Sequence, residues 1–188
     1  MIKGYEKSFE RANTFLRAFP ADIQKIIIRA QNRAIQSART AGVKAVRESY
    51  ITKAGDINKT IKVKKAAGGN LDARFTSRGS SIPLINFQVK PKKPQRMRGG
   101  RYLYAKVKRG EGGEIKGAFI ADGRKSGKRN IFIRTTNKSY PIRPLYTLSY
   151  PQMLENERVL KIMAARAEQM LETRINAETN ALLGGYTK

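Results

Sequence analysis

This chain of 188 residues contains no Cys, no His and no Trp, and it has only 14 Asp and Glu against 39 Lys and Arg. The absence of Cys and His excludes a disulfide-stapled fold, a zinc site with Cys or His ligands, an iron–sulfur cluster, a Cys nucleophile and a Ser-His-Asp triad. An enzyme would have to use carboxylate, Lys, Tyr or Ser side chains. The shortage of acidic residues leaves a formal net charge of +25.

Long apolar runs are also missing. The longest run, Ile26-Ile27-Ile28, is far shorter than the roughly 20 residues that a membrane span requires. The amino terminus lacks the continuous apolar region of a secretory signal. We therefore expect a soluble protein that makes no membrane contact and remains where it is made.

The charge is distributed unevenly along the chain. The length predicts one domain, residues 1–188, that can bury about 70% of the surface of its unfolded chain. Residues 1–51 carry a net charge of +6, residues 52–143 carry +19 and residues 144–188 carry 0. Solubility alone requires a net charge of only about 2–8 for a small domain. The middle segment is therefore predicted to meet a polyanion or an acidic partner.

The first segment predicts helices. Asp22 is a good N-cap residue, and apolar residues then recur at spacings of three and four, which predicts an amphipathic helix that reaches about Tyr50. The stripe consists of Ile23, Ile27, Ala30, Ala34, Ala38, Ala41 and Ala45. A shorter apolar stripe in residues 9–19 predicts a helix before it. Because the long stripe is mostly Ala, another element can approach it closely.

The last segment predicts one long helix. Ser149 is a plausible cap, Pro151 is suited to the first turn, and Gly184-Gly185 is the expected end. Its apolar stripe consists of Leu160, Ala164, Ala167, Leu171, Ile175 and Leu182. The two prolines of Tyr140-Pro141-Ile142-Arg143-Pro144 keep the chain before this helix extended.

The basic middle segment changes from a helical period to a period of two. Apolar residues alternate with polar or charged ones, or form short apolar runs, which predicts strands at 61–64, 71–75, 85–90, 102–107, 118–120 and 131–133. An apolar face opposite a Lys-rich face is typical of an antiparallel sheet with one solvated side. The predicted fold class is α+β: an antiparallel sheet of about five to six strands flanked by long N-terminal and C-terminal helices.

Two basic segments between the strands are predicted to be mobile loops, at residues 90–101 and 122–130, because closely spaced like charges repel. These loops supply the candidate contacts with DNA or with an acidic partner: Lys92, Lys93, Arg96, Arg98, Arg101, Arg124, Lys125, Lys128 and Arg129. Tyr102 and Tyr104 could stack on single-stranded bases, although their spacing is more typical of sheet residues.

Catalytic and nucleotide sites are weakly supported. Carboxylates that could hold Mg²⁺ in a nuclease are Asp56, Asp72, Glu111, Glu114 and Asp122. Glu114-Ile115-Lys116 imitates half of a restriction-like nuclease motif, but no Pro-Asp precedes it. A hairpin turn is the favoured interpretation of residues 110–114. The segment 123–129 lacks the spacing of a phosphate-binding P-loop.

The order of short blocks along the chain resembles the minor tail protein Z, or tail completion, family of long-tailed bacteriophages. Nearly the whole chain takes part, and no single block is a strong motif. The blocks include Ile2-Lys3-Gly4, Ala45-Val46-Arg47-Glu48, Asp72-Ala73-Arg74-Phe75, Ile82-Pro83-Leu84-Ile85-Asn86-Phe87, Gly117-Ala118-Phe119-Ile120, Tyr140-Pro141-Ile142 and Ser149-Tyr150-Pro151-Gln152-Met153.

This resemblance implies a structural virion protein of a phage or prophage and not an enzyme. The protein would be made in the bacterial cytoplasm and lie at the neck, the head-proximal end of the tail, where it is needed for head–tail joining and for placement of the DNA end. We expect a homo-oligomeric ring, a hexamer being favoured, and as partners the tail terminator, the tail tube or the head connector. Contact with phage DNA would be independent of sequence. No catalytic residue, metal ligand or cofactor is implied.

The alternative is a general nucleic-acid-binding protein of the ribosomal or nucleoid type. Neutralisation of phosphates needs many Lys and Arg side chains, which the middle segment supplies. No zinc-finger, basic-zipper or RNP signature accompanies them. Binding of bulk DNA or RNA across a salt series would distinguish this class from a tail protein.

Overall fold

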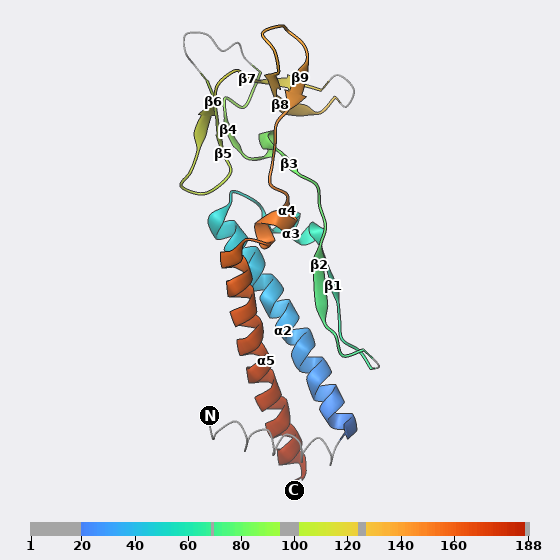
Figure 1. The fold of residues 1–188 in the computed structure, drawn as a ribbon. Helices are drawn as coiled ribbons and strands as arrows, with labels where there is room; N and C mark the ends of the chain where they lie inside the picture. The colour runs from blue at the N-terminus through green and yellow to red at the C-terminus, as the bar shows by residue number, and fades with distance from the viewer. Residues whose placement is uncertain (1–19, 69, 95–101, 124–126, 187–188) are drawn as a thin grey trace, which may run out of the picture. The chain divides into compact units, whose positions relative to one another are not determined.

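The computed structural model describes residues 20–68, 70–94, 102–123 and 127–186. They form two long helices, shorter helical turns and ten short strands (Figure 1), so the predicted α+β class with long N-terminal and C-terminal helices is confirmed. The chain divides into two compact units. Among the described residues, the first comprises 20–40, 63–76 and 163–186, and the second comprises 41–62 and 77–162. The assignment of the chain to one domain stays a prediction.

The first long helix is α2, Pro20–Ser49, which ends close to the predicted boundary at Tyr50. The residues of the predicted apolar stripe are buried except Ile27 and Ala41, which are half-buried. The prediction that Asp22 is the N-cap is wrong, because Pro20 and Ala21 are already helical and proline is tolerated in the first turn. The helix predicted in residues 9–19 lies outside the described residues.

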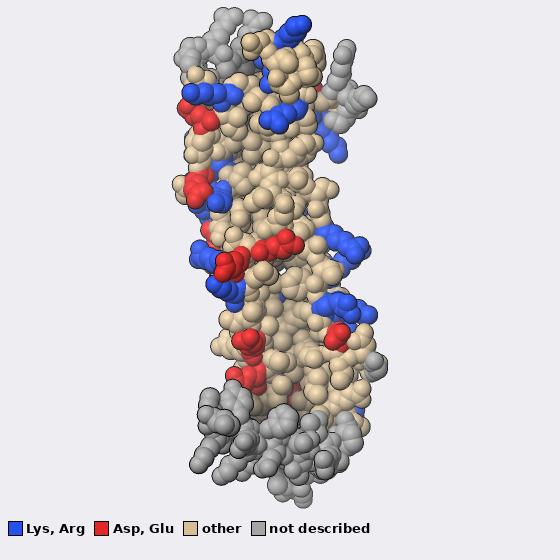
Figure 2. Space-filling model, in the orientation of Figure 1, with Lys and Arg blue, Asp and Glu red and all other residues tan. Residues whose placement is uncertain are grey.

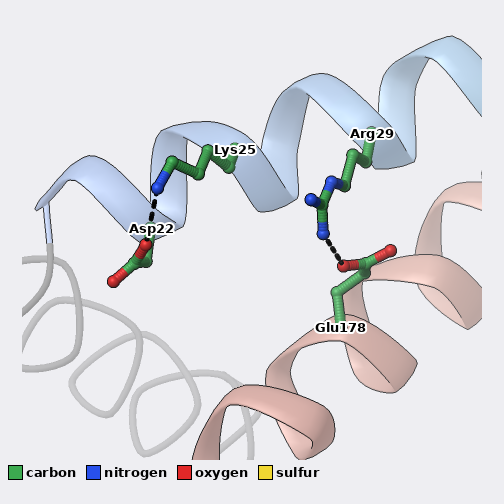
Figure 3. A network of polar contacts seen from close by, with 4 residues as sticks. All are labelled: Asp22, Lys25, Arg29 and Glu178. Atoms are coloured by element: carbon green, nitrogen blue, oxygen red, sulfur yellow. Dashed lines mark hydrogen bonds and ion pairs between the residues drawn. The ribbon is translucent and has the colours of Figure 1, made fainter.

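In the first unit, residues 20–40 of α2 lie beside residues 163–186 of α5, Glu157–Tyr186 (Figure 1). Small buried side chains on α2, Ala30, Ala34 and Ala38, leave room for close packing. Arg29 Nη1 of α2 lies 3.0 Å from Glu178 Oε2 of α5, while Lys25 pairs with Asp22 on its own helix (Figure 3). Polar side-chain contacts thus link the two long helices within this unit.

The chain after strand β1, Ile61–Lys64, is bonded to α2 in the same unit. Asn32 Nδ2 donates to the carbonyl of Ala66 at 2.9 Å, and the Ala66 N–H donates to Asn32 Oδ1 at 2.8 Å. Strand β1 pairs with β2, Arg74–Ser77. The strand predicted at 71–75 therefore begins three residues later than expected.

Three small sheets lie in the second unit. One has the order β4-β5-β6, with β4 at Gln88–Lys90, β5 at Leu103–Lys106 and β6 at Gly113–Ile115. Another has the order β7-β8-β9, with β7 at Ala118–Asp122, β8 at Arg129–Arg134 and β9 at Ile142–Pro144. The third pairs β3, Ile82–Pro83, with β10, Tyr146–Thr147. All three sheets are antiparallel.

One apolar core joins the two larger sheets of the second unit. It contains Leu84, Val89, Leu103, Ala105, Ala118, Ile120 and Ile131. The expected alternation holds in β4 and β5, where Val89, Leu103 and Ala105 are buried between more exposed polar neighbours. Burial of this face provides the main apolar stabilisation of the unit.

The described strands form four small sheets and not the single sheet of five to six strands that the sequence predicts. The strands are two to six residues long, and Pro83 and Pro144 lack the N–H that a longer ladder would need. The strand predicted at 85–90 is only partly present, because Leu84–Asn86 form the 3₁₀ turn η1 and β4 starts at Gln88. The Phe87 N–H donates to the Leu84 carbonyl at 3.2 Å, which closes this turn.

The predicted last helix is divided in two. Ser149 caps α4, Tyr150–Leu154, in a reciprocal capping box with Gln152, and Pro151 lies in the first turn, as predicted. The helix is then interrupted before α5 begins at Glu157. Asn156 Oδ1 accepts the Arg158 N–H at 3.1 Å, and the Asn156 carbonyl accepts the Leu160 N–H at 2.9 Å, so Asn156 acts as a second helix cap.

Two further predictions for this region are wrong. Helix α5 continues through Gly184-Gly185 to Tyr186 instead of ending at the glycines. The predicted stripe residues Leu160 and Ile175 are 49% and 38% exposed, whereas Val159 and Met163 are buried. The side chains of adjacent residues point in directions about 100° apart around the helix axis. Which of two neighbouring apolar residues is buried therefore depends on the elements that pack against α5.

Neither long helix in the described part of the chain is long and apolar enough to cross a lipid bilayer.

Candidate functional site

The hairpin of β7 and β8 carries one of the two predicted basic clusters. Asp122 and Arg129 are paired across the strands, with Nε 3.0 Å from Oδ1. The prediction of a loop over 122–130 is therefore too long, because Asp122 ends β7 and Arg129 and Asn130 begin β8. Arg129 shares its charge with a carboxylate, and Lys128 is exposed. The candidates Arg124 and Lys125 lie outside the described residues.

The second predicted cluster follows β4. Lys90 is the last residue of that strand and not part of a loop, because it pairs with Tyr104 of β5. The candidates Lys92 and Lys93 follow it and are exposed. Arg96, Arg98 and Arg101 lie outside the described residues, as does most of the loop predicted at 90–101.

On the face drawn in Figure 2, Lys and Arg side chains lie among Asp, Glu and uncharged residues. An anionic group is bound most readily where several cationic side chains converge.

Such a place is a cleft of about 860 Å³ within the second unit. Its cationic side chains come from three separate parts of the chain: Lys53 and Lys59 at the start and the end of α3 (Ala54–Thr60), Lys92 after β4, and Arg109 after β5. The other lining residues are Ile51, Thr52, Asp56, Ser80, Ser81, Ile82, Pro83, Asn86, Phe87, Gln88 and Tyr150. Four cations and one carboxylate give the lining a formal charge of +3.

Arg109 is held in place by the end of α2. Its backbone N–H donates to the Ser49 carbonyl at 2.8 Å, and its Nε donates to the Arg47 carbonyl at 2.7 Å. The last carbonyls of a helix have no partner within the helix and carry partial negative charge, so a guanidinium is favourable there. Because Nε is fixed, the two terminal nitrogens of Arg109 remain as oriented donors; within the described residues neither has a partner.

Of the other polar groups that line the cleft, some have an ion-pair or hydrogen-bond partner and some do not. Lys59 Nζ lies 3.1 Å from Asp56 Oδ1, so this pair is close to neutral. In the described chain the side chains of Lys53 and Lys92 form no ion pair or hydrogen bond, and the buried Thr52 Oγ1 has no hydrogen-bond partner. Unpaired cations are the donors that an anionic group requires.

Of the predicted contact residues that the structure describes, only Lys92 lines this cleft, and Lys53, Lys59 and Arg109 were not predicted. The prediction selected runs of Lys and Arg in two loops, whereas Lys53 and Lys59 come from α3 and Arg109 from the segment after β5, and none of them lies in those loops. The local sequence gives little indication that Arg109 is a binding residue, because it shows only a basic residue between a predicted strand and Gly110. Only the tertiary fold brings these cations together.

The carboxylates considered for a nuclease are dispersed. In the described residues no three acidic side chains come together in a group that could hold a metal ion. Asp56, Asp72, Glu111 and Asp122 each lie near a Lys or Arg, for example Glu111 with Lys108 at 3.3 Å. The hairpin interpretation of 110–114 is confirmed, since β5 pairs with β6 and Gly110 has a φ of 86°.

The two tyrosines of the β5 region have structural contacts. Tyr102 is 38% exposed, and Lys116 Nζ lies 5.7 Å from its ring centroid. Tyr104 lies over Gly112, where a Cβ would come within 2.6 Å of its Cζ. Stacking of either ring on a base stays a prediction.

Comparisons with known proteins gave one informative result. Neither the search of curated proteins nor that of solved structures found a match. The model of the prophage minor tail protein Z (GPZ) family matches residues 2–183, which is nearly the whole chain. The protein therefore belongs to the minor tail protein Z family and is a structural protein of a phage tail.

Proposed function

We propose that this tail protein is a completion component at the neck, the head-proximal end of the tail, where it makes the tail competent to join a filled head. The observation that carries the proposal is the family match over residues 2–183. In this role the protein acts as several copies in a ring, a hexamer being favoured, around the path of the DNA. No catalytic step and no cofactor are part of the proposal.

The charge of the middle segment supports contact with acidic neighbours. Residues 52–143 carry +19 of the total of +25. A ring that bound every DNA phosphate tightly would slow ejection, because each contact adds to the free energy needed to move the duplex. We therefore assign most of the charge to protein partners, namely the tail terminator, the tail tube or the head connector, and a minority to DNA.

The test is electron microscopy of particles produced without this protein. The expected result is separate filled heads and tails, with joining restored when the protein is supplied from a plasmid. Normal joined particles would overturn the neck assignment, and their tails would then be examined for a defect elsewhere.

A general nucleic-acid-binding role is the second candidate, and the net charge of +25 favours it. Filter binding of the isolated protein to DNA and RNA across a salt series tests it. Each neutralised phosphate adds roughly −0.9 to the logarithmic salt slope. Tight binding with a slope of about −6 or steeper would favour this role and count against the neck assignment.

A further inference from the structure

We propose that the basic cleft of the second unit binds a carboxylate-bearing peptide segment of a partner protein. The inference rests on the proposed function only in that the partner is a neighbouring protein of the tail. The cleft contains Lys53, Lys92 and Arg109, whose terminal nitrogens have no partner among the described residues. It therefore offers several cationic donors to one anionic occupant.

The geometry favours a small anionic group over a diffuse one. Arg109 is anchored through Nε, and its backbone N–H is bonded as well, so its terminal nitrogens form a preorganised fork. A guanidinium fork matches the two oxygens of a carboxylate.

The apolar part of the lining favours a peptide over a nucleic-acid duplex. Ile51, Phe87 and Tyr150 lie in the same cleft as the cations. A peptide brings carboxylates and apolar side chains together, whereas a duplex presents phosphates on a convex rod that cannot enter a hollow of about 860 Å³. Binding clefts commonly combine apolar walls with a few placed polar groups.

The test uses the full chain and a fluorescein-labelled peptide of alternating Glu and Leu, three of each, followed by fluorescence anisotropy. The same peptide with Gln in place of Glu is the uncharged probe. Two cleft variants, Arg109→Gln and Lys53→Gln, are compared with Arg143→Gln and Lys138→Gln. The control residues are exposed, lie in the same unit and do not line the cleft.

The acidic peptide is expected to bind more tightly than the uncharged one. Arg109→Gln should raise its Kd about tenfold, as expected for a charge-assisted hydrogen bond. Lys53→Gln should raise it about threefold, as expected for an exposed charge. Each control should change Kd by less than about twofold, because separated surface charges are screened by salt.

Several outcomes would overturn the proposal. The first is that the control variants weaken binding of the acidic peptide as much as the cleft variants do. The second is that the acidic and the uncharged peptide bind with equal affinity. The third is that a short DNA duplex binds the unsubstituted protein and the control variants but not the cleft variants. Self-association that Arg109→Gln abolishes would identify a second copy of the chain as the occupant. The Lys53 side chain forms no ion pair or hydrogen bond with the described residues, so its variant tests the cleft even if Arg109→Gln perturbs the fold.

Failure of this inference can be distinguished from failure of the neck assignment. The peptide assay needs only the isolated protein, while the neck assignment depends on joined particles. Suppose that the acidic peptide binds through the cleft, but that particles lacking the protein still have heads and tails joined. The inference about the cleft would then hold, and the neck assignment would be wrong.

Discussion

Arg29 of α2 and Glu178 of α5 form an ion pair at 3.0 Å although 149 residues separate them in the chain (Figure 3). The Arg29 side chain is 67% exposed and that of Glu178 is 24% exposed. The pair connects the two long helices within the first unit, as does the bond from Arg166 Nε to Ser37 Oγ at 2.9 Å. These two contacts are polar links between the long helices, in contrast to the unpaired cations of the cleft.

We expect the Arg29–Glu178 pair to contribute little to stability. The Arg29 side chain is largely solvated, so a double-mutant cycle with Arg29→Gln and Glu178→Gln should give a coupling free energy of about 0.2–1 kcal/mol. Urea unfolding measures it, and high salt should reduce it. Glu172→Gln, at an exposed position of the same helix, is the control. A coupling that is insensitive to salt would contradict this explanation.

Asn32 should matter more than the ion pair. Asn32→Ala removes both bonds to Ala66 and leaves a half-buried backbone N–H and C=O without these partners. The expected loss in the free energy of unfolding is about 1–3 kcal/mol. Gln24→Ala, an exposed amide on the same helix, should change it by less than about 0.5 kcal/mol. Equal effects of the two substitutions in urea unfolding would show that the Ala66 bonds are not important.

We expect that position 112 must be glycine, because the Tyr104 side chain lies close to its Cα. A Cβ at position 112 would overlap the Tyr104 hydroxyl, so Gly112→Ala should destabilise the protein by about 1–3 kcal/mol. Gly113→Ala is the matched control, because nothing lies within 4 Å of its Cβ position. Thermal unfolding measures both. In a double variant with Tyr104→Leu, most of the stability lost through Gly112→Ala should be recovered. If the double variant shows the same loss, overlap with the Tyr104 side chain is not its cause.

The capping box at α4 provides a further test. Ser149→Ala removes the side chain that accepts the Gln152 N–H at the start of the helix. The expected loss is about 1 kcal/mol in the free energy of unfolding. Ser139→Ala, at an exposed position outside the helices and strands, should have almost no effect. Equal stability of both variants in urea unfolding would contradict a role for the cap.

Local patterns of the sequence predicted the long helices and most strands. The spacing of Ala30, Ala34 and Ala38 reports one face of a helix, and the alternation around Leu103 and Ala105 reports one face of a strand, because each depends on a fixed repeat of the backbone. The cap at Ser149 is likewise encoded within four residues. The sequence does not predict the break between α4 and α5, where Asn156 caps the start of α5, because apolar residues continue on both sides of it. Nor does it predict the 3₁₀ turn at Leu84–Asn86, because Ile85, Phe87 and Val89 alternate with polar residues as in a strand.

The sequence by itself determined the fold class, the excess of positive charge in residues 52–143 and the resemblance to minor tail proteins, since composition and short-range periodicity carry all three. Only the tertiary structure decided which face of α5 is buried, how the strands divide among sheets and which cations converge. Lys53, Lys92 and Arg109 lie far apart in the chain, and Arg109 is oriented by carbonyls at the end of α2. Such a site depends on long-range packing, which no local repeat of residues encodes.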